Sequence, residues 1–349
     1  TADICPVGAL TSNDFRFQMR VWFLKETKSI DVNCGTGANT VIWTRGNEVF
    51  RVTPRQNDDV NSSWMPDSHR LSFNRLQTDD RLSGPLIKKD GKHLQSSWME
   101  ATAHAAAGLG MRQSDEVAII ASGRLSNEEL YLTKKIAEAL GTELSATVPR
   151  VGEPDGKLIS ADRNPNTTGA SLIWNTSEPS EKLDAIREGV SSGRIRALIV
   201  LSEDLLEEAG FESTDLEKLD HLVVSHTHAN PTASHANVVL SGAGFAEKRA
   251  TYVNVTGRLQ RANQAVIAPG DSRDDWETLA ALLSQLDENY SPPASMDAVL
   301  NHISSEVSEF KGQTFGSIGD LGIQITETGV TIPLLEQEKA RVESGQIVG

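Results

Sequence analysis

Two cysteines are the residues of this chain best suited to bind a metal or a cluster, and the first, Cys5, is followed at once by a proline. A Cys-Pro pair is typical of the end of an iron–sulfur ligand series, because proline ends local helix and turns the chain away. A cluster needs about four such ligands. Cys5 is therefore predicted to be a cluster ligand whose companions are missing from a chain that is a piece of a longer one. The alternative is a small buried apolar side chain.

The second cysteine, Cys34, lies in a glycine-rich turn that spans residues 31–39. Such a turn could direct backbone amides and thiolates at a cluster, but here one thiolate is present. One cysteine alone holds neither a four-iron cluster nor a tetrahedral zinc ion, so a structural role for Cys34 is favoured.

Three histidines, His226, His228 and His235, lie close together after a predicted strand. They could be zinc ligands, but the loop has no Asp or Glu to orient them. Ordinary polar loop residues are the favoured interpretation.

No sequence pattern identifies a catalytic nucleophile with its base, and the common phosphate-binding glycine motifs are absent from the sequence. The net charge of −15 argues against nucleic acid and anionic lipid as partners. No apolar run approaches the roughly 18 residues of a membrane span, so direct membrane insertion is not expected.

The elements that would position these residues alternate between strand and helix from about residue 96. Apolar runs predict strands, helical periodicity predicts helices, and Gly141 is predicted to cap the second helix. Together they predict an α/β body with a doubly wound, largely parallel sheet. Before this body, the pattern predicts an amphipathic helix over 14–26, a hairpin over 40–53 and a polar wrapping segment over 54–95. At the other end of the chain it predicts a weakly packed, partly disordered tail after Pro333. The predicted strands are 116–121, 197–201, 221–224 and 238–240, and the predicted helices are 98–109, 127–140, 182–193, 276–286 and 298–310.

Seven segments resemble one family, the large iron–sulfur subunit of proton-pumping NADH:quinone oxidoreductase, respiratory complex I. The resemblance extends over roughly residues 1–290. It implies a molybdopterin-oxidoreductase-like body behind the tail of a ferredoxin-like iron–sulfur region. The domains expected from it are 1–27 (end of the iron–sulfur region), 28–85 (degenerate 4Fe-4S subdomain) and 86–349 (α/β body). The segments that carry it are 5–24, 81–91, 97–101, 127–132, 160–166, 245–248 and 257–261.

Departures from the family pattern concern two cofactors. The optional second cluster of the family uses four cysteines, and the matching positions here are Asp31, Cys34, Ala38 and Pro66, so this cluster is expected to be absent. Molybdenum enzymes of the wider superfamily place a metal ligand near the position of Gly152, which has no side chain. No molybdopterin is therefore expected.

The resemblance implies that Cys5 completes a 4Fe-4S cluster with ligands upstream of Thr1, and that the chain is an electron relay and scaffold without a catalytic centre of its own. The implied partners are other peripheral-arm subunits, including the flavin-bearing subunit that oxidises NADH. The implied location is the cytoplasmic side of a bacterial inner membrane, as a peripheral part of a membrane complex. Two alternatives are a molybdopterin-dependent oxidoreductase, such as a formate dehydrogenase chain, and the iron–sulfur subunit of an NAD-reducing hydrogenase.

Overall fold

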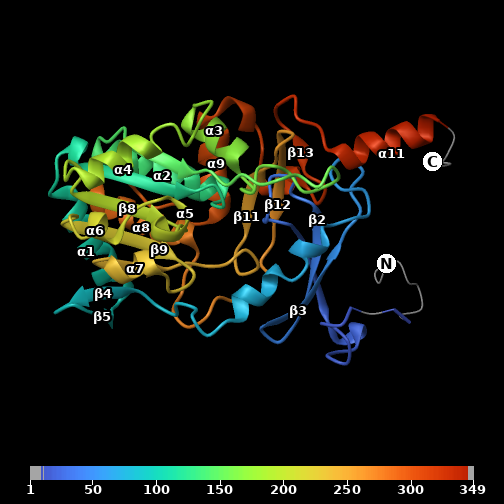
Figure 1. Ribbon diagram of the computed structural model, residues 1–349, viewed down its shortest axis with the longest axis horizontal. Helices are drawn as coiled ribbons and strands as arrows, with labels where there is room; N and C mark the ends of the chain where they lie inside the picture. The colour runs from blue at the N-terminus through green and yellow to red at the C-terminus, as the bar shows by residue number, and fades with distance from the viewer. Residues whose placement is uncertain (1–8, 11, 345–349) are drawn as a thin grey trace.

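Three β-sheets organise the computed structural model, which describes residues 9–10 and 12–344 (Figure 1). Two small sheets have the strand orders β1-β2-β3 and β11-β12-β13, and all their pairs are antiparallel. The large sheet has the order β5-β4-β10-β9-β8-β6-β7. The strands are β1 Lys25–Ile30, β2 Asn39–Arg45, β3 Glu48–Pro54, β4 Leu86–Lys89, β5 Lys92–Gln95, β6 Val117–Ser122, β7 Ser145–Val148, β8 Ala197–Leu201, β9 His221–His226, β10 Val238–Ser241, β11 Ala250–Val253, β12 Arg258–Ala262 and β13 Ile323–Gln324.

The large sheet is doubly wound, as the sequence predicts. From β6 the chain adds β7 on one side, and then returns to add β8, β9 and β10 on the other, all in parallel pairs. Every residue of β6 and β8 is buried, which is the expected state of strands covered by helices on both faces. The order of strands changes direction between β6 and β8, and their carboxyl ends form the switch point of the sheet.

Alternate residues of β6 pack into two different cores. Val117, Ile119 and Ala121 contact the core shared with α1, α2, α8 and α9, whereas Ala118 and Ile120 contact the core shared with α4 to α7. This alternation places one layer of helices on each face of the sheet. The helices are α1 Trp98–Gly110, α2 Asn127–Leu140, α3 Thr167–Trp174, α4 Leu183–Ser191, α5 Leu205–Glu208, α6 Ser213–Leu216, α7 Pro231–His235, α8 Asp275–Leu286, α9 Met296–Glu306, α10 Phe315–Ile318 and α11 Pro333–Glu343.

Local signals fix the ends of α2. Ser126 accepts a hydrogen bond from the backbone of Glu129, whose carboxylate bonds back to the Ser126 amide, so the helix begins with a capping box. Gly141 ends it with φ of 65°, the left-handed conformation that glycine adopts without strain. The predicted helix and its cap are confirmed.

The prediction of an amphipathic helix over 14–26 is wrong. The segment holds only a short 3-10 helix, Val21–Phe23, before β1 begins at Lys25. Phe17 is 92% exposed and Trp22 is 71% exposed, whereas Phe15 is buried, so the apolar residues of the segment do not share one buried face. An amphipathic helix needs such a face to be stable, and pairing with β2 decides the conformation of the next residues instead.

The predicted hairpin over 40–53 is confirmed as β2 and β3, with Gly46 in the turn at φ of 61°. The wrapping segment contains a second hairpin, β4 and β5, which the sequence pattern did not predict. Its strands are only four residues long, and β4 is held by antiparallel pairing with β10. The tail forms α11, which has no buried residue, so its weak packing is confirmed but residues 333–343 are helical rather than disordered (Figure 1).

Candidate functional site

Cys5, the predicted cluster ligand, lies outside the described residues, so its role stays a prediction. The remaining predicted site residues fall into three places: the loop between β1 and β2, the switch point of the large sheet, and the loop after β9.

The loop between β1 and β2 packs closely against the α/β body. The Asp31 amide donates to the carbonyl of Ala38, at 2.7 Å, and closes the loop. Gly37 has φ of 65°, and a Cβ there would lie 2.5 Å from the side-chain oxygen of Gln260. The nearby Gly35 amide donates to the body at the carbonyl of Asp162, at 2.9 Å. Close packing of the loop against the body accounts for Gly35 and Gly37, so an iron–sulfur cluster is not needed to explain these two glycines.

Asp31 is paired with a histidine that the sequence pattern did not single out. Its Oδ2 lies 2.5 Å from Nδ1 of His69, and both side chains are largely buried. His69 ends the 3-10 helix Asp67–His69, which directly follows Pro66. The signal that could have found it is this spacing, since His69 lies three residues beyond the last expected cluster ligand.

Cys34 lies beside this pair. One potential ligand atom from each of Asp31, Cys34 and His69 lies within 4.8 Å of the others. The Cys34 side chain is buried, and its sulfur is 3.9 Å from the carbonyl oxygen of Leu158. Burial, followed by the negative charge of Asp31, raises the pKa of the Cys34 thiol above its ordinary value.

An ion cluster occupies the carboxyl ends of the strands at the switch point. The guanidinium of Arg150, which follows β7, contacts the carboxylates of Glu203 and Glu208, which follow β8. Arg150 also donates to the side-chain oxygen of Asn164 at 3.2 Å. Burial raises the pKa of Glu203 to about 7, although hydrogen bonding to Arg150 acts against this rise. Open sheets of this kind bind ligands at this edge, and here the edge holds the ion cluster of Arg150, Glu203 and Glu208.

Gly152, the position compared with a molybdenum ligand, lies close to this cluster in sequence. A Cβ at Gly152 would be 2.6 Å from Nε of Arg163, so the guanidinium stands where a longer side chain would need to extend. Arg163 in turn donates to the carbonyl of Glu153 at 2.6 Å.

His226 ends β9, and His228 and His235 follow it. Nδ1 of His226 accepts from the amide of His228 at 3.0 Å, and Nε2 of His228 lies 2.7 Å from the carbonyl of Arg75. Nε2 of His235 lies 3.0 Å from the hydroxyl of Ser213. Burial lowers the pKa values of His226 and His228. The structure thus uses these rings to tie loops together and does not bring them to one point.

A buried ion network that the sequence pattern did not predict anchors the amino end of α2. Nζ of Lys248 lies 2.5 Å from Oε1 of Glu129 and 3.1 Å from Oδ2 of Asp275. Burial alone would lower the pKa of Lys248, but the two carboxylates raise it well above its ordinary value. Glu128 is also buried and accepts from the amide and the hydroxyl of Thr251.

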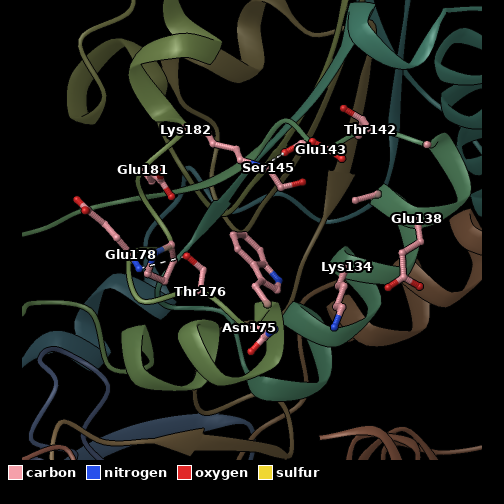
Figure 2. A pocket seen from close by; sticks show the side chains of 14 residues that line it. Lys134, Glu138, Thr142, Glu143, Ser145, Asn175, Thr176, Glu178, Glu181 and Lys182 are labelled. Carbon is pink, nitrogen blue, oxygen red and sulfur yellow. Dashed lines mark hydrogen bonds between the residues drawn. The ribbon is translucent and has the colours of Figure 1, made fainter.

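A cavity of about 560 Å³ lies at the opposite end of the sheet, beside the start of β7 and the end of α2 (Figure 2). Its lining carries two lysines, Lys134 and Lys182, and more glutamates than lysines. Nζ of Lys182 donates to the carbonyl of Glu143 at 2.7 Å. The lining has no histidine or cysteine to serve as a nucleophile or base, so we assign no chemistry to it. The charged side chains drawn there are Lys134, Glu138, Glu143, Glu178, Glu181 and Lys182.

Comparison with known proteins identifies the body. Residues 81–172 and 175–285, more than half of the chain, match the family model for molybdopterin oxidoreductases. The chain belongs to the molybdopterin oxidoreductase family. Residues 24–74, ahead of most of this match, fit a second family model, the 4Fe-4S domain described as NADH-ubiquinone oxidoreductase NDSU1/NuoG-like. The resemblance stated from the sequence is thereby confirmed.

Three curated relatives of this molybdopterin oxidoreductase family member are named as subunits of NADH-ubiquinone or NADH-quinone oxidoreductase. The chain is 26% identical to the mitochondrial NADH-ubiquinone oxidoreductase 78 kDa subunit of Candida albicans, over 91% of this chain and 61% of the relative. It is 25% identical to the NADH-ubiquinone oxidoreductase 75 kDa subunit of Reclinomonas americana, over 82% of this chain and 61% of the relative. A subunit of the NADH-quinone oxidoreductase of Rickettsia felis is 39% identical, over 40% of this chain and 21% of the relative. The chain therefore spans about three-fifths or less of the length of these relatives.

A solved structure shares the fold of this molybdopterin oxidoreductase family member. Acetylene hydratase from Pelobacter acetylenicus superposes with a TM-score of 0.65 at 8% identity, over 86% of this chain and 74% of that chain. The predicted α/β fold is thereby confirmed.

The described residues do not fit either cofactor that these matches imply. Ala38 and Pro66 are buried and have no ligand atom in their side chains, so the loop holds too few donors for a 4Fe-4S cluster. At the switch point, Gly152 lacks a ligand atom, and Arg150 with its two glutamates occupies the strand ends. We therefore derive no chemical step through a cluster or a pterin at these two places.

Proposed function

We propose that this chain is part of the large iron–sulfur subunit of the peripheral arm of NADH:quinone oxidoreductase, and that it acts as an electron relay and scaffold. The observation that carries the proposal is the order of domains in one chain: a NuoG-like 4Fe-4S domain followed by a molybdopterin oxidoreductase body. The occupied switch point supports a body that no longer performs cofactor chemistry.

The iron–sulfur role would rest on Cys5, as a thiolate donor to a 4Fe-4S cluster completed by upstream cysteines. The described residues next to this segment support contact with further protein. Phe17, Trp22 and Phe23 are exposed, and exposed aromatic groups of this kind mark surfaces that another protein surface covers. The partners in this proposal are other peripheral-arm subunits, including the flavin-bearing one that oxidises NADH.

The attachment to a membrane would be indirect, on the cytoplasmic side of a bacterial inner membrane. No helix in the described part of the chain has the length and apolar character needed to cross a bilayer. In this proposal the subunit reaches the membrane through its partners.

The test uses the full-length subunit in assembled membranes, with Cys5→Ala and Cys34→Ala compared. Because relays act in series, Cys5→Ala should lower NADH:quinone activity strongly while NADH:ferricyanide activity survives. Cys34→Ala should leave both rates close to the parent. Loss of quinone reduction in Cys34→Ala alone, with Cys5→Ala unaffected, would contradict the assignment.

Metal analysis of the native protein separates the alternatives. Iron without molybdenum, in a particle that contains the NADH-oxidising subunit, supports the proposal. Stoichiometric molybdenum would instead indicate a molybdopterin-dependent oxidoreductase, such as a formate dehydrogenase chain. Co-purification with hydrogenase subunits would indicate the iron–sulfur subunit of an NAD-reducing hydrogenase.

A further inference from the structure

We propose that Asp31, Cys34 and His69 form a site for one divalent transition-metal ion, with Zn²⁺ as the expected occupant, in the loop whose positions no longer suit an iron–sulfur cluster. Among residues 9–10 and 12–344 these three form the one group of metal-binding side chains whose ligand atoms converge. The proposal does not depend on the function proposed above.

The donor set is the first argument. A thiolate, an imidazole and a carboxylate are the three side-chain ligands that zinc takes in proteins, and three of them leave a fourth position for water. The two cluster-ligand positions that lack donors, Ala38 and Pro66, do not prevent this. A single ion needs fewer protein ligands than a four-iron cluster, and His69 supplies one from outside the cluster pattern.

The distances are the second argument. Oδ2 of Asp31 and Nδ1 of His69 are 2.5 Å apart, and all three ligand atoms lie within 4.8 Å of one another. Ligand atoms around a tetrahedral zinc ion are about 3.3–3.6 Å apart, as its bond lengths require. Binding therefore needs the longest separation to contract by about 1 Å and the Asp31–His69 pair to open by about 1 Å. Side-chain rotation supplies movements of this size.

Surrounding groups hold two of the ligands in orientation. Oδ1 of Asp31 accepts from the amide of Asn33 at 3.0 Å and from its side-chain nitrogen, so Oδ2 is the oxygen left to face the site. Asn33 is itself fixed by Ser72, at 3.1 Å. The Cys34 thiol donates to the carbonyl oxygen of Leu158, at 3.9 Å. Partners of this kind orient ligands and contribute to metal affinity.

Burial is the third argument. Cys34 is 1% exposed, and the Asp31 and His69 side chains are 2% and 10% exposed. A bound ion would therefore be shielded from competing solvent, with the His69 side as the route of entry. It would link the end of β1 to the 3-10 helix that follows Pro66, two segments that are distant in sequence.

The test is metal titration of the full 349-residue chain under reducing, anaerobic conditions, with Zn²⁺ and with Co²⁺ as a spectroscopic probe. We expect one ion per chain, a thiolate-to-cobalt charge-transfer band and a raised melting temperature on addition of Zn²⁺. Cys34→Ser should abolish the band. His69→Gln and Asp31→Asn should weaken binding by more than about 100-fold, and Asn33→Ala by about 10–100-fold.

Matched controls use the same residue types elsewhere. Cys5→Ser changes the other cysteine of the chain, and His93→Gln changes a histidine whose Nε2 bonds to the carbonyl of Ala236. Both should bind like the parent, and circular dichroism verifies the fold of each variant. Absence of stoichiometric binding in the folded parent would overturn the proposal. So would a cobalt–thiolate band that disappears in Cys5→Ser and persists in Cys34→Ser.

Discussion

Replacing Lys248 with methionine should be among the most destabilising single changes in the body. The substitution shortens the unbranched side chain by one heavy atom and removes the cation that lies between Glu129 and Asp275, all three residues being buried. Removing one partner of a buried ion pair typically costs about 3–5 kcal/mol, because the remaining charge is left without compensation. With two carboxylates left behind, we expect the upper part of that range at pH 8.

The sign of the pH dependence follows from the same geometry. Burial raises the folded-state pKa of Glu129 above its ordinary value, and Lys248 acts against this rise, so the pKa should be higher still in the variant. The folded variant then binds protons more tightly than its unfolded state, so it loses stability as pH rises. The cost relative to the parent should therefore be smaller at pH 5.5 than at pH 8.

The assay is urea unfolding followed by far-ultraviolet circular dichroism at both pH values. Lys28→Met is the matched control, because its ion pair with Asp320 is exposed and should be worth about 0–1 kcal/mol. The double variant Lys248→Met/Glu129→Gln should recover about 1–3 kcal/mol of the loss through the pairwise coupling. A cost no larger than that of Lys28→Met, or one equal at both pH values, would refute the reasoning.

Three further changes test other parts of the structure by the same unfolding assay. Burial raises the pKa of Glu128 to about 7, so the free energy of unfolding of the parent should fall between pH 4.5 and 7. Glu128→Gln should make this fall smaller by about 2–3 kcal/mol, and an unchanged fall would contradict the burial argument. Arg150→Met should cost about 3 kcal/mol at pH 8 and less at pH 6, because Glu203 is left buried without its cation; equal costs would contradict this. Gly257→Ala should cost more than about 1 kcal/mol, because Gly257 has φ of 86° and a Cβ there would lie 2.1 Å from a backbone carbonyl oxygen. Gly110→Ala is the control: its Cβ would lie in open space at the end of α1, so the change should be neutral or stabilising.

The elements of the large sheet could be predicted from the sequence because their signals are local. β6 and β8 are uninterrupted apolar runs, and α2 has a cap at each end. β1 could not be predicted in this way, because Lys25–Ile30 reads Lys-Glu-Thr-Lys-Ser-Ile, with no apolar alternation. Its conformation is imposed by pairing with β2, which is a tertiary interaction.

The residues of the candidate sites likewise divide into those with a local sequence signal and those brought together only by the fold. The loss of cluster ligands at Ala38 and Pro66 is visible in the sequence, because it concerns residue types at a fixed spacing. The contact of His69 with Asp31 joins residues 38 positions apart, and that of Lys248 with Glu129 joins residues 119 positions apart. The spacing of His69 from Pro66 indicates a candidate ligand but not its contact with Asp31, and no spacing connects Lys248 with Glu129, so the fold had to be known before these contacts could be found.

The two places compared above with cofactor positions of the resembling family hold ionisable side chains rather than apolar ones. At the switch point, Arg150 is balanced by Glu208, and burial raises the pKa of Glu203 to about 7, so that this carboxyl is partly protonated at neutral pH. In the loop after β1, Oδ2 of Asp31 contacts Nδ1 of His69. At either place, a buried carboxylate that loses its partner is left without compensation. The difference between the two places is the Cys34 sulfur beside the second pair. It adds a soft donor that the switch point lacks, and this is why we assign metal binding to the loop and a purely structural role to the ion cluster of Arg150.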